Sequence, residues 1–140
     1  MQDEWAIQRL INTYSQYGSV GDWDTAVGTY AADGVWEIPH FGMRFEGHAA
    51  IRQALTDFFA GMDYVIQLNS PALIEIDGDR ATARSNVNEG GKTAGKDEGF
   101  AFFGYYADEL VRTGEGWKFT KRTFIGTGSS LYPLTQGTRH

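Results

Sequence analysis

The sequence predicts a single α+β domain: a cone-shaped, curved mixed sheet, mostly antiparallel, with three N-terminal helices enclosing an apolar pocket. Two patterns predict this fold. Apolar residues recur at helical spacing in three segments up to about residue 60, and apolar and polar residues then alternate as far as residue 126. Aromatic residues make up 14% of the 140 residues, which suits a pocket lined by rings. We expect one domain over residues 1–140, with a core at 3–126 and a tail at 127–140.

The three helices are expected at residues 3–18, at residues 24–32 and after Gly47. The first has one apolar face, which carries Tyr14 and Tyr17 in its last turns. Asp24 is the expected N-cap residue of the second helix. The third has a continuous apolar stripe. Its members are Ile51, Ala54, Leu55, Phe58 and Phe59.

The strands are expected as a short hairpin and a longer meander. The hairpin comprises residues 35–38 and 43–46, and the meander residues 64–76, 80–89, 100–112 and 117–126. The polar, glycine-rich segment 90–99 is expected to be a mobile loop, and residues 127–140 show no periodicity. Every second residue from Ala81 to Glu89 forms the expected inward face, although the opposite phase stays open. Asp108 and Arg122 are expected to form an ion pair between two strands.

Composition and charge narrow the function classes. A net charge of −6 without a basic cluster argues against nucleic acid and anionic membranes as partners. The chain has no cysteine, and its three histidines lack metal-ligand spacing, so no metal site is expected. No phosphate loop or dinucleotide fingerprint occurs, so no cofactor is expected. With no signal sequence and no long apolar run, a soluble cytoplasmic protein is expected.

Several short motifs, in order, carry a family resemblance. They are GDWD at 21–24, YAADGVWE at 30–37, EGHAAI at 46–51, IEIDGD at 74–79 and GWKF at 116–119. Across residues 5–126 the chain resembles the SnoaL-like branch of the nuclear-transport-factor-2-like superfamily. The resemblance implies a cofactor-independent reaction on a hydrophobic, often cyclic substrate inside the cone. It also implies a homodimer formed through the outer face of the sheet.

The chain departs from this family at its usual catalytic dyad, an Asp after the first helix and a His on the first long strand. Ser19 stands where the Asp is expected, and Ile66 or Gln67 stands where the His is expected. Serine is not a base at neutral pH, and neither replacement does the work of a histidine. The chain therefore uses different chemistry or none.

The remaining candidate site residues are tyrosines, one carboxylate and aromatic side chains. Tyr14 matches a tyrosine that donates a proton or orients an oxygen in dehydratase-like members, and Tyr17 lies near it. Glu89, which matches an Asp of bile-acid dehydratase-like members, is a candidate general base, as is His40. The candidate substrate-binding residues are Trp36, Asn69, Phe102, Tyr106 and Phe124.

Three functions remain open from the sequence. The first is a cofactor-independent lyase or isomerase that acts on a small aromatic or polycyclic compound by dehydration, elimination or proton transfer. The second is a non-catalytic protein that binds a small hydrophobic molecule and has lost the dyad. The third is an accessory subunit of a larger oxygenase.

Overall fold

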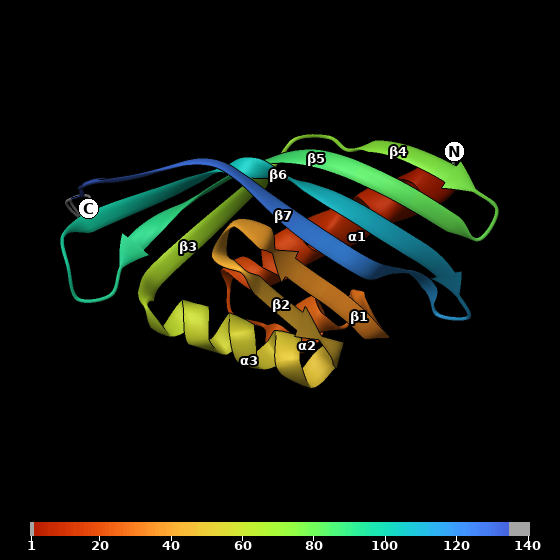
Figure 1. Cartoon of the computed structure of the whole chain (residues 1–140), viewed down its shortest axis with the longest axis horizontal. Coiled ribbons are helices and arrows are strands. Elements are labelled where there is room, and N and C mark those ends of the chain that lie inside the picture. The colour runs from red at the N-terminus through yellow and green to blue at the C-terminus, as the bar shows by residue number, and fades with distance from the viewer. Residues whose placement is uncertain (1, 135–140) are drawn as a thin grey trace, which may run out of the picture.

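The computed structural model describes residues 2–134 and has one strongly curved sheet with the helices on its concave side (Figure 1). The helices are α1 (Gln2–Ser19), α2 (Trp23–Val27) and α3 (Gly47–Ala60), with a short 3-10 helix at Pro39–Phe41. The strands are β1 (Tyr30–Ile38), β2 (Met43–Glu46), β3 (Met62–Asn69), β4 (Leu73–Asp77), β5 (Arg80–Thr93), β6 (Glu98–Thr113) and β7 (Gly116–Pro133).

The seven-stranded sheet has the order β2-β1-β7-β6-β5-β3, and β4 also pairs with β5. Only the β1–β7 pair is parallel among these neighbours; the other pairs are antiparallel. The expected α+β class and the curved, mostly antiparallel sheet are therefore confirmed. Figure 1 shows β5, β6 and β7 arching over α1 and α3.

Bulges and close strand contacts produce the curvature. The β6–β7 register shifts between Phe103 and Gly104 and again between Glu109 and Leu110, and an extra residue of this kind bends and twists a strand. A side chain at Gly104 would place its Cβ 2.1 Å from the carbonyl oxygen of Ile125. The bend at this point therefore requires glycine.

The core lies between α1 and the concave face of the sheet. Ile7 and Ile11 of α1 are fully buried, as are Leu110 of β6 and Phe119 of β7. Spacing of four residues places Ile7 and Ile11 on one helix face, which packs against the inward row of the sheet. This packing fixes the position of α1 and of the residues in its last turns.

The second helix is shorter than expected. It ends at Val27, and β1 begins at Tyr30, whereas a helix was expected as far as residue 32. Its N-cap is Asp22 rather than Asp24. The Asp22 carboxylate accepts two hydrogen bonds from Thr25, one from the backbone N–H (3.1 Å) and one from the side-chain hydroxyl (2.7 Å). The parallel pairing of Tyr30 with Phe119 draws the following residues into the sheet.

Two strand predictions were wrong at their boundaries. The segment 64–76 is two strands, β3 and β4, and the break falls at Ser70 and Pro71. Proline has no N–H to donate, so it interrupts the pairing with β5. The segment 90–99 is mostly strand rather than a mobile loop, because β5 continues to Thr93 and β6 begins at Glu98.

The glycines of this segment allow close strand approach. At Gly91 an added Cβ would lie 2.1 Å from the carbonyl oxygen of Tyr64 on the neighbouring strand. The expected tail is also partly strand, since β7 runs to Pro133 and pairs there with Glu98 of β6. Residues 135–140 of that tail lie outside the described residues.

Candidate active site

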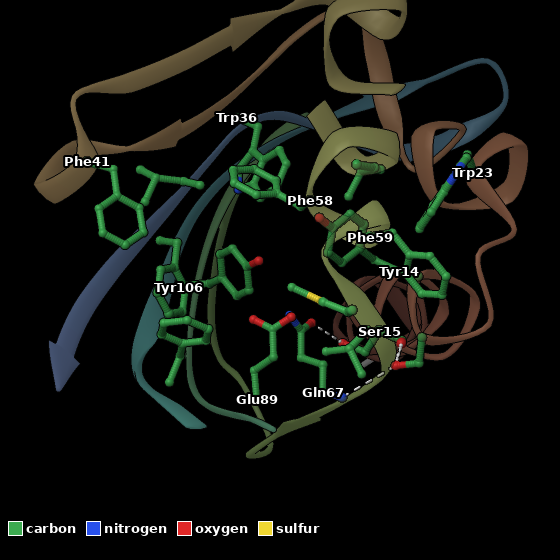
Figure 2. Close-up of a pocket in the computed structure, with 18 residues that line it drawn as sticks. Tyr14, Ser15, Trp23, Trp36, Phe41, Phe58, Phe59, Gln67, Glu89 and Tyr106 are labelled. Carbon is green, nitrogen blue, oxygen red and sulfur yellow. Dashed lines mark hydrogen bonds between the residues drawn. The ribbon is translucent and has the colours of Figure 1, made fainter. Parts of the chain in front are cut away.

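An apolar cavity of about 160 Å³ lies between α1, α3 and the concave face of the sheet (Figure 2). Its aromatic and aliphatic wall comprises Trp23, Trp36, Ile38, Phe41, Leu55, Phe58, Phe59, Met62, Val65, Phe102 and Phe124. Its polar lining comprises Tyr14, Ser15, Ser19, Gln67, Glu89 and Tyr106. Glu89 is the one charged residue among the residues that line this cavity.

Glu89 projects into the cavity from the inward row of β5. The row Ala81, Ala83, Ser85 and Val87 is buried while the intervening residues are exposed, which confirms the inward phase expected from the sequence. Burial among rings raises the pKa of the Glu89 carboxyl from 4.5 to about 7, and a hydrogen bond from the Gln67 side chain partly opposes the rise. Glu89 can therefore both accept and donate a proton near neutral pH.

Two tyrosines bring hydroxyl groups to the same cavity. Tyr14 comes from the last turns of α1 and Tyr106 from β6, and their rings meet edge to face with centroids 6.3 Å apart. In Figure 2 the Tyr106 hydroxyl points into the hollow above Glu89. Burial raises the pKa of both phenols well above the usual value of 10. Both hydroxyls are therefore neutral hydrogen-bond donors at pH 7.

A buried ion pair lies behind these phenol rings. Arg122 of β7 donates two hydrogen bonds to the Asp108 carboxylate of β6, at 2.8 and 3.1 Å, and both side chains are 0% exposed. The expected ion pair is thus confirmed. The guanidinium carbon lies 3.8 Å from the ring centroid of Tyr106 and 4.8 Å from that of Tyr14. This positive charge lowers the pKa of both phenols, although burial outweighs it.

The two dyad positions hold amide and hydroxyl groups. Gln67 lines the cavity, whereas Ile66 points away from it and is 56% exposed, so Gln67 stands at the position where a histidine was expected. The Ser19 hydroxyl donates to the carbonyl oxygen of Ser15 (2.8 Å) and accepts from the backbone N–H of Gln67 (3.4 Å). Ser19 therefore links α1 to β3.

The structure brings most of the sequence-predicted site residues together. Those that line the cavity are Tyr14, Glu89, Trp36, Phe102, Tyr106 and Phe124. Three other predicted site residues do not line the cavity: Tyr17, His40 and Asn69.

Each of the three lies outside for a geometric reason. Tyr14 lies at one edge of the buried face of α1, and Tyr17, about 60° further around the helix, falls outside that face and is 44% exposed. His40 is exposed in the 3-10 helix, with its ring 4.1 Å from that of Phe41. Asn69 lies one pleat beyond Gln67 on β3 and donates to the hydroxyl of Ser15 instead of reaching the cavity.

Ser15 is a site residue that the sequence did not indicate. It lies among polar residues on α1, next to Tyr14, and only its contact with β3 shows its place in the cavity wall. Phe58 and Phe59 were recognised as part of the apolar stripe of α3, but nothing in the stripe showed that they face a hollow rather than solid core.

Within residues 2–134, no group of three or more His, Cys, Asp or Glu side chains is arranged to hold a metal ion. None of the helices in that part of the chain is long and apolar enough to cross a membrane.

The model of the SnoaL-like domain family matches residues 1–123. The chain therefore belongs to the SnoaL-like domain family, which confirms the resemblance seen in its motifs. A search of curated proteins found no match.

Three solved structures illustrate the likeness. A Novosphingobium aromaticivorans protein, provisionally named an aromatic ring hydroxylase, is 27% identical over 94% of both chains, with a TM-score of 0.86. A second protein from that organism, provisionally named a scytalone dehydratase, is 20% identical over 100% of both chains, with a TM-score of 0.84. The LinA-type3 hexachlorocyclohexane dehydrochlorinase of Novosphingobium barchaimii is 14% identical over 96% of this chain and 93% of that chain, with a TM-score of 0.85.

Proposed function

We propose that this protein is a cofactor-independent lyase or isomerase in which Glu89 transfers the proton. The observation that carries the proposal is a single carboxyl group in an apolar cavity, beside two tyrosine hydroxyls, with its pKa raised to about 7. A general base works best when its pKa lies near the operating pH. The membership of the SnoaL-like family and its dehydratase and dehydrochlorinase neighbours support the same class of reaction.

The proposed reaction begins when the Glu89 carboxylate removes a proton from a carbon of the substrate. The negative charge that develops moves onto a substrate oxygen, which accepts a hydrogen bond from Tyr14 or Tyr106. Expulsion of a leaving group then completes an elimination, or return of the proton from Glu89 to a second carbon completes an isomerisation. Arg122 behind the phenol rings favours the charge that the tyrosine hydroxyls stabilise.

The size of the cavity favours a substrate with one ring. A dry protein cavity of about 150 Å³ holds one benzene molecule, and the cavity here measures about 160 Å³. A one-ring aromatic or cyclic compound with an oxygen substituent therefore fits better than a polycyclic one. Ring edges from Trp36, Phe58 and Tyr106 would enclose it.

The test uses a panel of compounds, so it does not depend on which of them is the natural substrate. The protein is incubated in D₂O with one-ring ketones, phenols and halides, and deuterium incorporation and product formation are followed by NMR. We expect exchange or turnover for at least one compound, and at least a hundredfold loss in Glu89→Gln. Glu75→Gln, a matched change at an exposed strand position, should keep full activity. Equal rates in wild type and Glu89→Gln would refute the proposal.

A second candidate, a binding protein without catalysis, is favoured by Ser19 and Gln67 at the dyad positions. Neither side chain is a base at neutral pH. The same panel distinguishes the two functions. Tight binding of a ring compound with no deuterium exchange and no product would support the binding protein.

A further inference from the structure

A chain of polar side chains connects Glu89 to α1 through the wall of the cavity. Asn69 of β3 donates to the Ser15 hydroxyl, and the Ser15 hydroxyl lies 2.9 Å from the side-chain oxygen of Gln67. Gln67 and Glu89 are directly opposed partners in the antiparallel β3–β5 pair. The chain therefore runs from Asn69 through Ser15 and Gln67 to Glu89, and Figure 2 shows its link between Ser15 and Gln67 beside Glu89.

Ser15 has two acceptors within reach of one hydroxyl hydrogen. The first is the side-chain oxygen of Gln67 at 2.9 Å, and the second is the backbone carbonyl of Ile11 at 3.3 Å. A serine hydroxyl donates once and accepts twice. Ser15 is 5% exposed, so bulk solvent has little access to this hydrogen. Its hydrogen must therefore go to one of the two acceptors at a time.

The acceptor of the Ser15 hydroxyl hydrogen determines which end of the Gln67 amide faces Glu89. When Ser15 donates to the Gln67 oxygen, the amide N–H₂ of Gln67 is the end that faces Glu89, and it can donate to the carboxylate. When Ser15 donates to Ile11, its oxygen is free to accept from a turned Gln67 amide. The Gln67 oxygen then faces Glu89 and accepts a hydrogen bond from the protonated carboxyl group.

We propose that Ser15 and Gln67 are positioning residues that hold Glu89 in both of its protonation states by reversing the direction of this hydrogen-bond chain. In both states the Gln67 amide has a partner at Ser15 and a partner at Glu89, and Asn69 keeps the same bond to Ser15. Buried polar groups that lose their partners cost free energy, so a chain that reverses is more stable than one fixed in a single direction. The proposal deepens the proposed function, because it concerns how the proton-transferring group is held.

Few other groups influence the titration of Glu89. The titratable side chains that face it are Tyr14 of α1 and Tyr106 of β6, and both stay neutral well above pH 10. The residues that α3, β1, β3 and β7 contribute to the cavity carry no charge. The side chains of two ion pairs, Asp108 with Arg122 and Lys92 with Asp63, are not among the residues that line the cavity. A change near pH 7 in the hydrogen bonds that connect Asn69, Ser15 and Gln67 therefore reports on the titration of Glu89.

The test is an NMR titration of the free protein from pH 5 to pH 9. The Glu89 carboxyl carbon, the Gln67 side-chain amide and the backbone carbonyl carbon of Ile11 are followed together. We expect all three to shift with one midpoint near 7. In Ser15→Ala the Ile11 carbonyl should stop responding, and Glu89→Gln should abolish the response of both Gln67 and Ile11. Thr13→Ala, which removes an exposed hydroxyl from the same helix, should leave all three unchanged.

A second variant tests whether Gln67 stabilises the Glu89 carboxylate. Gln67→Leu removes the hydrogen-bond donor, and a hydrogen bond to the charged carboxylate is stronger than one to the neutral carboxyl group. The pKa of Glu89 should therefore rise by about one unit. Gln67→Met serves if the leucine variant does not fold. An Ile11 carbonyl that stays constant in the wild type while Glu89 titrates, or an unchanged Glu89 pKa in the Gln67 variant, would overturn the proposal.

The titration needs no substrate, so its outcome is independent of the catalytic assay. A coupled titration without turnover would support the positioning role of Ser15 and Gln67 and refute the proposed reaction. Turnover with an Ile11 carbonyl that does not respond would keep the reaction and overturn the positioning chain.

Discussion

Gln67 and Glu89 face each other across β3 and β5 and place an amide against a carboxyl group in an apolar cavity. In this chain the amide occupies the position expected to hold a histidine. Among the residues that line the cavity, the one carboxyl group is that of Glu89, which lies on a different strand from the expected histidine.

Glu89 should make the protein less stable as the pH rises. Its pKa is about 7 in the folded protein and near 4.5 when unfolded. The folded state therefore binds the proton more tightly than the unfolded state. As the pH rises from about 4.5 to about 7, the free energy of unfolding decreases by roughly 3 kcal/mol in total. Glu89→Gln should be more stable than wild type at pH 9 but not at pH 4. Urea unfolding at both pH values checks this. An equal difference at the two pH values would contradict it.

The ion pair between Asp108 and Arg122 should be sensitive to the loss of one partner. Asp108→Asn leaves a fully buried guanidinium without its countercharge, and such a change costs about 3–5 kcal/mol. The double variant Asp108→Leu/Arg122→Met should lose less free energy of unfolding than either single variant, because no unpaired charge remains. Chemical denaturation measures both, with Glu109→Gln at an exposed neighbouring position as the control. A loss below about 1 kcal/mol in Asp108→Asn would refute the prediction.

Filling the cavity should abolish binding without unfolding the protein. Val65 lies in the cavity wall, so Val65→Phe extends a ring into the space of about 160 Å³. We expect at least a tenfold weaker affinity for a one-ring probe such as phenol, with a change in the free energy of unfolding of about 1 kcal/mol or less. Calorimetry and urea unfolding give the two quantities. Val20→Phe, at an exposed position after α1, is the control for added ring area. Unchanged phenol affinity in Val65→Phe would place the binding site elsewhere.

The outer face of the sheet should form a homodimer interface. Large apolar side chains project there, away from the cavity, and they come from β3, β4 and β6. They are Ile66, Leu68, Leu73 and Phe103. We expect a dimer at micromolar concentration in analytical ultracentrifugation, and a folded monomer for Ile66→Lys/Leu68→Lys. A monomeric wild type would contradict the prediction, and a copurifying different chain would favour the oxygenase-subunit alternative.

Periodicity predicted much of the fold and part of the site. Alternation along β5 placed Glu89 at the end of an inward row, and helical spacing placed Tyr14 on the buried face of α1. Both inferences were correct, because burial of one face imposes a period on each element. The same alternation placed Asp108 and Arg122 on paired strands, where they form the buried ion pair.

The places where the sequence misled have a common cause. The glycine-rich segment 90–99 was expected to be a mobile loop, yet Gly91 lies in a strand because its neighbours leave no room for a side chain. Tyr17 shares the polarity of Tyr14 but not its direction. Ser15 has no pattern at all, and its role appears only in contact with Gln67. Each depends on what lies opposite the residue in space.

The sequence by itself determined the class of fold and the buried direction of Tyr14, and the family resemblance indicated the absence of the usual dyad; it favoured an inward Glu89 but left the opposite phase open, and the burial pattern of β5 decided it. Only the tertiary structure decided that Gln67 rather than Ile66 faces the cavity, and that the rings surround a hollow instead of filling it. The physical reason is that periodicity records which side of an element is buried. The volume left between elements depends on how α1, α3 and the curved sheet pack together.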